Sequence, residues 1–246
     1  MPKGKLPKKN LTKCVKTWYK VPCRMENQWQ ADDGIRSSRN KYVQMKTDKK
    51  YDRFSRFFDA SETFMEKSKF GRWRELVFEK IPEETSVLEV GIGTAKNLPY
   101  YGKGIHVTGI DFSKGMLEKA RKKLHRFPEK KVVLLEMDVM NMGFPDRSFD
   151  FVASTFVFCT VPDPLAGLKE VKRVLKPGGK AIFLEHMRSA SALNNLFLYG
   201  MSGLTVPLIG TSMVRKTKQN IQKAGFQIIE EQNLFSDIVK LLVCTR

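Results

Sequence analysis

Cysteine and histidine are scarce in this chain of 246 residues, which has four cysteines and three histidines. Cys14, Cys23, Cys159 and Cys244 are widely separated, and no two of them form a CxxC pair. This spacing excludes a zinc ribbon and a dense disulfide framework, so we expect no metal site and a reducing compartment. No apolar segment follows the basic N-terminus, so we also expect no secretory signal.

Acidic residues are also few, with 26 Asp and Glu against 44 Lys and Arg, for a formal net charge of +18. More than half of this excess lies in an N-terminal arm, residues 1–50, which has 14 basic and 4 acidic residues. Such a charge attracts polyanions, either nucleic acid or an anionic membrane surface. A hydrophobic content of 41% excludes a wholly disordered chain, and the length suits one large α/β domain with extensions.

Two N-terminal segments have apolar patterns typical of helices. In the arm, Leu11, Cys14, Val15 and Trp18 follow helical spacing among lysines. This pattern predicts a short basic amphipathic helix that either lies on a membrane or docks on the domain. Residues 51–81 are rich in aromatic side chains. We expect them to form helices that are either part of the core or a lid over a pocket.

From residue 85 onward, strand and helix patterns alternate. Continuous apolar strands separated by helices predict a doubly wound, mostly parallel α/β sheet. The expected strands are Ser86–Val90, Ile105–Ile110, Val132–Glu136, Phe149–Phe156 and Lys180–Glu185. The expected helices follow Thr94 and cover Lys114–Arg126, Pro164–Leu175 and Lys216–Ala224.

The C-terminal part of the chain departs from this alternation. Phe226–Gln232 and Asp237–Cys244 both have strand character, and only Asn233–Ser236 separates them. A connection this short predicts an antiparallel hairpin.

An uncharged segment, residues 189–214, lies between Arg188 and Arg215. It is apolar but is interrupted by Gly, Asn, Ser and Pro, so it is a poor candidate for a membrane span. We expect an apolar surface loop or re-entrant insertion, or else a simple insertion that covers the core.

A glycine-rich turn follows the first strand, in the segment Val87–Ala95. Gly91 and Gly93 permit a tight turn and close approach of a ligand at the carboxyl edge of the sheet. Lys96 occupies the third glycine position of a dinucleotide fingerprint, and Glu89 would repel a pyrophosphate. The turn therefore favours a different nucleotide-like ligand.

Acidic residues stand at the ends of three successive strands. Asp111 follows Gly91 by 20 residues, where a carboxylate can accept the hydroxyls of a ribose. Asp138 follows the third strand and could accept from an adenine amino group. With Glu89, these acids indicate an adenosine ligand that bears a positive charge.

These motifs resemble those of the class I S-adenosylmethionine-dependent methyltransferases. Glu89–Ala95 is similar to the E-x-G-x-G-x-G motif of the family, with Ala95 in place of its last glycine. Asp111 and Asp138 match the second and third acidic motifs, and Arg173–Gly179 matches the turn before strand five. The resemblance covers residues 51–246 and implies a seven-stranded sheet, with the terminal hairpin supplying the antiparallel strand.

Within this family the chain is most similar to the ubiquinone/menaquinone-type and phospholipid N-methyltransferase branch. The similarity rests on Tyr51–Arg53, on Phe156–Pro164, and on Glu185 followed by His186. It implies that Tyr51 closes over the methionine end of the cofactor. The residues implied in S-adenosyl-L-methionine binding are Tyr51, Glu89, Gly91, Gly93, Thr94, Asp111, Phe112, Met116, Asp138, Val139 and Thr155.

Three residues are candidates for a general base that removes a proton from the methyl acceptor. His186 is the first candidate by its near-neutral pKa, Glu185 the second and Tyr51 the third. A structural role for His186 remains open. Cys159 lies in an apolar run, which favours a small core residue over a nucleophile.

The sequence predicts a cytoplasmic, peripherally membrane-associated methyltransferase with a lipid-soluble acceptor, either a phospholipid amine such as phosphatidylethanolamine or a quinone precursor. The basic arm and the uncharged segment would together bind an anionic membrane. A small thiol or amine, or RNA, is the alternative acceptor. RNA is less favoured because Ser154–Val157 stands where amino-methylating nucleic-acid enzymes carry N/D-P-P-Y/F/W. The sequence indicates no particular oligomeric state.

Overall fold

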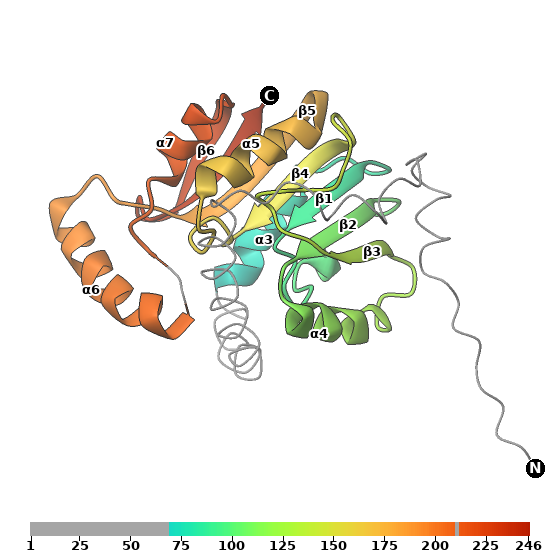
Figure 1. The fold of residues 1–246 in the computed structure, drawn as a ribbon, viewed down its shortest axis with the longest axis horizontal. Helices are drawn as coiled ribbons and strands as arrows, with labels where there is room; N and C mark the ends of the chain where they lie inside the picture. The colour runs from blue at the N-terminus through green and yellow to red at the C-terminus, as the bar shows by residue number, and fades with distance from the viewer. Residues whose placement is uncertain (1–68, 210–211) are drawn as a thin grey trace, which may run out of the picture.

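A seven-stranded sheet forms the centre of the computed structural model, which describes residues 69–209 and 212–246 (Figure 1). The strand order is β3-β2-β1-β4-β5-β7-β6. Strands β1 to β5 pair in parallel, and β7 pairs antiparallel with both β5 and β6. The strands are β1 Ser86–Val90, β2 His106–Asp111, β3 Lys131–Glu136, β4 Phe149–Thr155, β5 Leu175–His186, β6 Gln227–Phe235 and β7 Val239–Thr245.

Helices cover both faces of this sheet, as expected for a doubly wound fold. Helices α3 (Gly71–Phe78) and α4 (Lys114–Leu124) pack on one face. On the opposite face pack α5 (Pro164–Val174) and α7 (Thr217–Lys223). The strands contribute to both apolar layers because alternate side chains point to opposite faces. The prediction of the fold class is confirmed.

Two helix starts follow directly from local sequence. The side chain of Ser113 accepts a hydrogen bond from the Met116 amide at the start of α4. Asp163 does the same for Ala166 at the start of α5, where Pro164 occupies the first turn. Such caps satisfy amides that have no partner within the helix.

The segment after Thr94 differs from expectation, because it forms turns and a short 3-10 helix, η2 (Leu98–Tyr100), and no α-helix. Pro99 lies in the first turn of η2, and Ala95 has a left-handed φ of 58°. A residue in that conformation cannot continue a right-handed helix. The chain therefore turns sharply at the carboxyl edge of the sheet.

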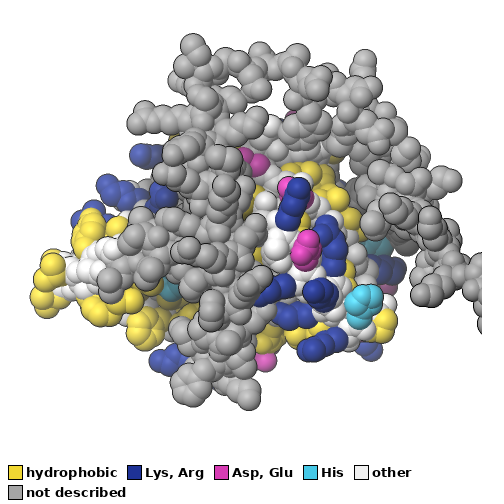
Figure 2. Space-filling model, turned by 60° about the horizontal axis from the view of Figure 1, so that its bottom comes forward, with side chains coloured by type: hydrophobic (Ala, Val, Ile, Leu, Met, Phe, Trp, Pro, Cys, Tyr) yellow, Lys and Arg dark blue, Asp and Glu magenta, His cyan; other side chains and the backbone are white. Residues whose placement is uncertain are grey.

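The uncharged segment also differs from the expected loop, because most of it is helix α6 (Ala192–Ile209). Asn195, Leu198 and Ser202 are buried, and their spacing places them on one face of the helix. Gly200 and Gly203 each weaken a helix by about 1 kcal/mol, which this packing offsets. Helix α6 stands to one side of the sheet (Figure 1), and Figure 2 shows hydrophobic side chains gathered at that end of the molecule.

The predicted arm (residues 1–50) and most of the predicted lid (51–81), including Tyr51, lie outside the described residues. Within residues 69–81, α3 is helical and its Trp73, Val77 and Phe78 are buried. No helix in the described part of the chain is long and apolar enough to cross a membrane.

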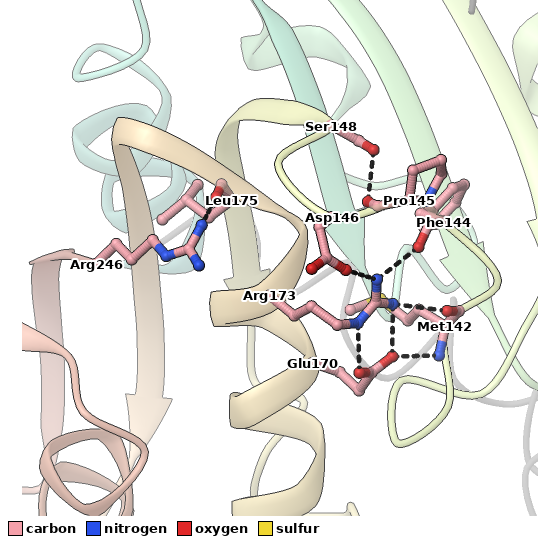
Figure 3. Close-up of polar contacts among 9 residues, drawn as sticks. All are labelled: Met142, Phe144, Pro145, Asp146, Ser148, Glu170, Arg173, Leu175 and Arg246. Atoms are coloured by element: carbon pink, nitrogen blue, oxygen red, sulfur yellow. Dashed lines mark hydrogen bonds and ion pairs between the residues drawn. The ribbon is translucent and has the colours of Figure 1, made fainter. Parts of the chain in front are cut away.

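Arg173, near the end of α5, holds the loop that leads into β4 (Figure 3). Its Nη2 donates to the Met142 carbonyl at 2.8 Å and its Nη1 to the Phe144 carbonyl at 2.7 Å. Both oxygens of Glu170 accept from this guanidinium, and Glu170 Oε2 also accepts from the Met142 amide. One planar guanidinium thus donates to two carbonyls of the loop and to both oxygens of a carboxylate. Only arginine has enough donors in a fixed plane to do this.

The Arg173→Lys variant should lose about 1–3 kcal/mol of unfolding free energy, because a single ammonium group cannot reach all of these acceptors. Urea denaturation measures this change. Arg121→Lys, at an exposed position on α4, is the matched control and should change little. Equal stability of the two variants would contradict the assigned role of Arg173.

Candidate active site

A cavity of about 290 Å³ lies at the carboxyl ends of the central strands. Its lining comes from the glycine-rich turn after β1, the end of β2, the segment after β4 and the end of β5. The edge of a parallel sheet at the point where strand order reverses is the usual ligand site of this architecture. The lining includes, of the residues predicted from sequence, Gly91, Gly93, Thr94, Asp111, Phe112, Met116, Val139, Thr155 and His186.

The glycine-rich turn gives the cavity a bare backbone wall. Gly91 has a φ of +64°, and a Cβ atom added there would lie 2.5 Å from Cγ2 of Val157. Gly93 also has positive φ. A side chain at Gly91 would therefore both strain the backbone and collide with the opposite wall. This turn can accommodate a nucleoside at close range.

Asp111 fixes the second wall of the cavity at the end of β2. Its Oδ2 accepts from the Gly93 amide and its Oδ1 from the Ser113 amide, both at 2.9 Å. The carboxylate is 8% exposed. It therefore joins the glycine-rich turn to the start of α4, and it lies where ribose hydroxyls could donate to it.

Glu89 is not among the lining residues, and the structure places it beneath the cavity. It accepts from Asn97 Nδ2 at 2.6 Å and from the Tyr101 hydroxyl at 2.7 Å. Burial raises its pKa from 4.5 to about 7, against these hydrogen bonds and nearby Arg74, which lower it. Through the first of these hydrogen bonds Glu89 contacts Asn97, which does line the cavity.

Arg74, from α3, is a lining residue that the sequence did not single out. It is 6% exposed, and its Nη1 donates to Asn97 Oδ1 and, at 3.3 Å, to Thr155 Oγ1. It brings a guanidinium into the cavity from α3, the helix that precedes the glycine-rich motif in sequence. The only local signal was a basic residue within an apolar helical pattern.

Asp138 also lies outside the lining, although Val139 beside it is part of the wall. Asp138 Oδ1 accepts from the Met140 amide at 2.8 Å, which is a local turn contact. The described structure thus brings Asp111, but not Asp138, to the cavity.

The remaining wall is apolar and contains His186. Its ring packs on the ring of Phe156, with 4.6 Å between the ring centroids. The ring of Phe70 also packs on Phe156, with 5.2 Å between the centroids. Burial lowers the pKa of His186 from 6.5 to about 4, so the imidazole is neutral at physiological pH. Its Nδ1 is buried and has no hydrogen-bond partner within the described residues. The neutral imidazole can accept a proton, but a pKa of about 4 makes it a weak base near neutral pH.

Glu185, the residue before His186, does not line the cavity and is fully buried. Its Oε1 accepts from the amides of Val157 and Phe158, at 2.9 and 3.1 Å, and from Ser154 Oγ at 3.1 Å. These bonds hold the turn that contains Phe156, whose φ of 59° is rare for a bulky residue. Burial raises the pKa of Glu185 to about 7.

Cys159 is buried and lines the same cavity. Its Sγ contacts the Phe156 carbonyl at 3.3 Å. Burial is the largest of the effects that raise the pKa of this thiol well above its usual range. A thiol in this state is a poor nucleophile, in agreement with a packing role.

Comparisons with known proteins agree with this geometry. A family described as a methyltransferase domain matches residues 88–183. The chain is 42% identical over 101 residues to a phosphatidylethanolamine N-methyltransferase of Cereibacter sphaeroides, over 41% of this chain and 50% of that protein. It is 32% identical over 184 residues to a demethylmenaquinone methyltransferase of Staphylococcus epidermidis, over 68% of this chain and 75% of that protein. The chain therefore spans half the length of the first relative and three quarters of the second.

The fold also resembles a solved structure, that of an S-adenosylmethionine-dependent methyltransferase from Aquifex aeolicus. The TM-score is 0.53 at 22% identity, over 70% of this chain and 88% of the other. Fold, motifs and relatives agree on one cofactor, S-adenosyl-L-methionine. The chain belongs to the class I S-adenosylmethionine-dependent methyltransferases, in the branch that contains the quinone-type and phospholipid N-methyltransferases.

Proposed function

We propose that this enzyme transfers the methyl group to a lipid-soluble acceptor, a phospholipid amine or a quinone precursor, while it lies at a membrane surface. The observation that carries the proposal is helix α6. It exposes large apolar side chains, and its Thr205 lines the active-site cavity. The names of the relatives, a phospholipid and a quinone methyltransferase, support the same class of acceptor.

Among the α6 side chains that the structure describes, the large apolar ones that are exposed are Leu193, Leu196, Phe197 and Tyr199. Leu193 is 80% exposed and Leu196 73%. Contiguous exposed apolar side chains of this size mark interaction sites. Because Thr205 of the same helix reaches the cavity, a membrane that received these side chains would place its lipids next to the catalytic site.

S-adenosyl-L-methionine supplies an electrophilic sulfonium methyl group, so the protein has mainly to position the reactants and exclude water. We assign the ribose hydroxyls to Asp111 and the methionyl carboxylate to Arg74, a buried cation in the lining. We assign the removal of the acceptor's proton to the neutral imidazole of His186, because it lines the cavity. Glu185 acts as a positioning residue, because its carboxylate holds the turn at Phe156 and not the acceptor.

The membrane proposal predicts that the Leu196→Gln/Phe197→Gln variant transfers at least about tenfold less labelled methyl into anionic liposomes, because two apolar anchors are lost. Its affinity for S-adenosylmethionine should not change. Ile229→Gln, at an apolar position 49% exposed on β6, is the matched control.

Chromatography of the organic phase then names the acceptor as phospholipid or quinone. Retained transfer in the α6 variant would contradict the proposed membrane contact. Label found only in a soluble thiol, a soluble amine or RNA would overturn the class of acceptor.

The cofactor assignment predicts different ligand profiles for two variants. Arg74→Met should weaken S-adenosylhomocysteine about 10- to 100-fold by loss of a charged hydrogen bond, yet leave 5′-methylthioadenosine unchanged, since that ligand lacks the carboxylate. Asp111→Asn should weaken both ligands. Calorimetric titration measures each affinity.

Arg72→Met, at an exposed position on the same helix, controls for the loss of a positive charge. If Arg74→Met weakened both ligands equally, its role would be to shape the cavity through Asn97 and Thr155, and the carboxylate assignment would be wrong.

The raised pKa of Glu185 predicts a pH-dependent stability. Between pH 4.5 and about 7 the folded protein binds more protons at Glu185 than the unfolded chain does, so the unfolding free energy decreases as pH rises through this window. Glu185→Gln removes this contribution, which amounts to roughly 3 kcal/mol. Urea denaturation at pH 5 and pH 8 measures it.

Glu118→Gln, exposed on α4, should retain the pH dependence of the unaltered protein. An unchanged pH dependence in Glu185→Gln would show that Glu185 remains ionised in the folded state.

A further inference from the structure

A second cavity, of about 390 Å³, lies beside the active site and differs from it in charge. His186 lines the first cavity, and the next residue, Met187, lines the second. The second cavity is formed by the segment after β5, the start of α6, the start of α7, and β7. Its cationic side chains are Arg188, Arg215, Lys216, Lys218 and Lys240, and its one carboxylate is Asp237.

The carboxylates around this cavity already have partners. Glu231 pairs with Lys218 at 2.5 Å and with Lys240 at 2.6 Å. Asp237 accepts from Ser189 Oγ and from the Ala190 amide, both at 2.6 Å, and these bonds lower its pKa. The carboxylates thus fix two lysines and the start of the α6 segment.

The other three cationic side chains of the cavity have no carboxylate partner in the part of the chain that the structure describes. Among the described residues, Arg188, Arg215 and Lys216 form no ion pair, and the side chain of Arg215 has one hydrogen bond, from Nη2 to the Val161 carbonyl at 3.3 Å. The Arg188 amide donates to the Arg215 carbonyl at 3.0 Å, which holds the two arginines side by side. Adjacent cations with no acidic partner favour a bound anion.

Two buried polar atoms at the cavity also have no partner in the described structure. Thr217, 1% exposed, has an unpartnered Oγ1, and Arg215 has an unpartnered Nε. Buried polar groups are nearly always hydrogen-bonded, so each such group requires an explanation. Both groups can donate a hydrogen bond, and a phosphate oxygen would satisfy either.

We propose that this cavity binds the phosphate of a membrane phospholipid headgroup, at a site separate from the one that holds the methyl acceptor. Asn195 of α6 lines the cavity and is hydrogen-bonded to Ser189 through both its amide oxygen and its amide nitrogen. The cationic site therefore adjoins the helix that carries the exposed apolar side chains. A phosphate group next to apolar acyl chains is characteristic of a phospholipid. The assignment of the phosphate to a lipid, and not to a soluble phosphate ester, rests on the proposed membrane function.

The test compares Arg188→Gln/Lys216→Gln with Arg121→Gln/Lys122→Gln, an exposed pair on α4 that removes the same two charges. Binding to phosphatidylcholine vesicles with and without phosphatidylglycerol is measured by sedimentation. Binding of glycerol 3-phosphate is measured by calorimetry in the absence of membrane. The first pair should lose about 10- to 30-fold in both assays, and the α4 pair less than about threefold.

Thr217→Val tests the site without a change of charge. It should weaken glycerol 3-phosphate several-fold and leave the melting temperature equal or higher, because the hydroxyl has no partner to lose. Unchanged phosphate binding in this variant would overturn the assignment of Thr217.

The other outcomes separate the two proposals. Binding of glycerol 3-phosphate that depends on Arg188 and Lys216, without vesicle binding, would support a phosphate site, reject the lipid source and count against the membrane function. Equal losses of binding in the two double variants would overturn the site, because general attraction between opposite charges would then explain the binding. Displacement of vesicles by RNA at the same residues would assign the cavity to nucleic acid instead.

Discussion

Buried carboxylates at the carboxyl ends of parallel strands hold together the backbone around the catalytic cavity. Asp111 joins the glycine-rich turn to α4, and Glu185 holds the strained turn at Phe156. A carboxylate is costly to bury unless several donors face it, and amides in tight turns need acceptors. Each group therefore stabilises the other.

The parts that the sequence predicted correctly are those set by local pattern. Continuous apolar runs between turn residues predicted the positions of the strands. The separation of 20 residues in sequence between Gly91 and Asp111 predicted one wall of the cavity. The rest depends on contacts between distant segments. Arg74 reaches the cavity from a helix with no motif of its own, and Glu89 is covered because Asn97 and Tyr101 fold back over it. Helix α6 forms where Gly and Ser predicted a loop, because tertiary packing of Leu198 outweighs propensity.

The end of β5 separates two chemical environments. His186, the last residue of β5, lines the apolar cavity, and the next residue, Met187, lines the cationic one. Helix α6 contributes to both, through Thr205 on one side and Asn195 on the other. A single strand end and a single helix thus separate the cavity proposed for methyl transfer from the cavity proposed for phosphate binding.

Helix α6 lies entirely within the connection between β5 and α7, and it contributes no residue to any of the seven strands. The register of β5 with β7 is set by the pairs from Lys180 with Thr245 to His186 with Val239, none of which includes a residue of the helix. The exposed residues of this connection can therefore change without a change in the pairing of the sheet or in the glycine-rich turn. On the proposed role of α6, the side of the enzyme that receives the acceptor is separate in sequence from the strand ends assigned to the methyl donor.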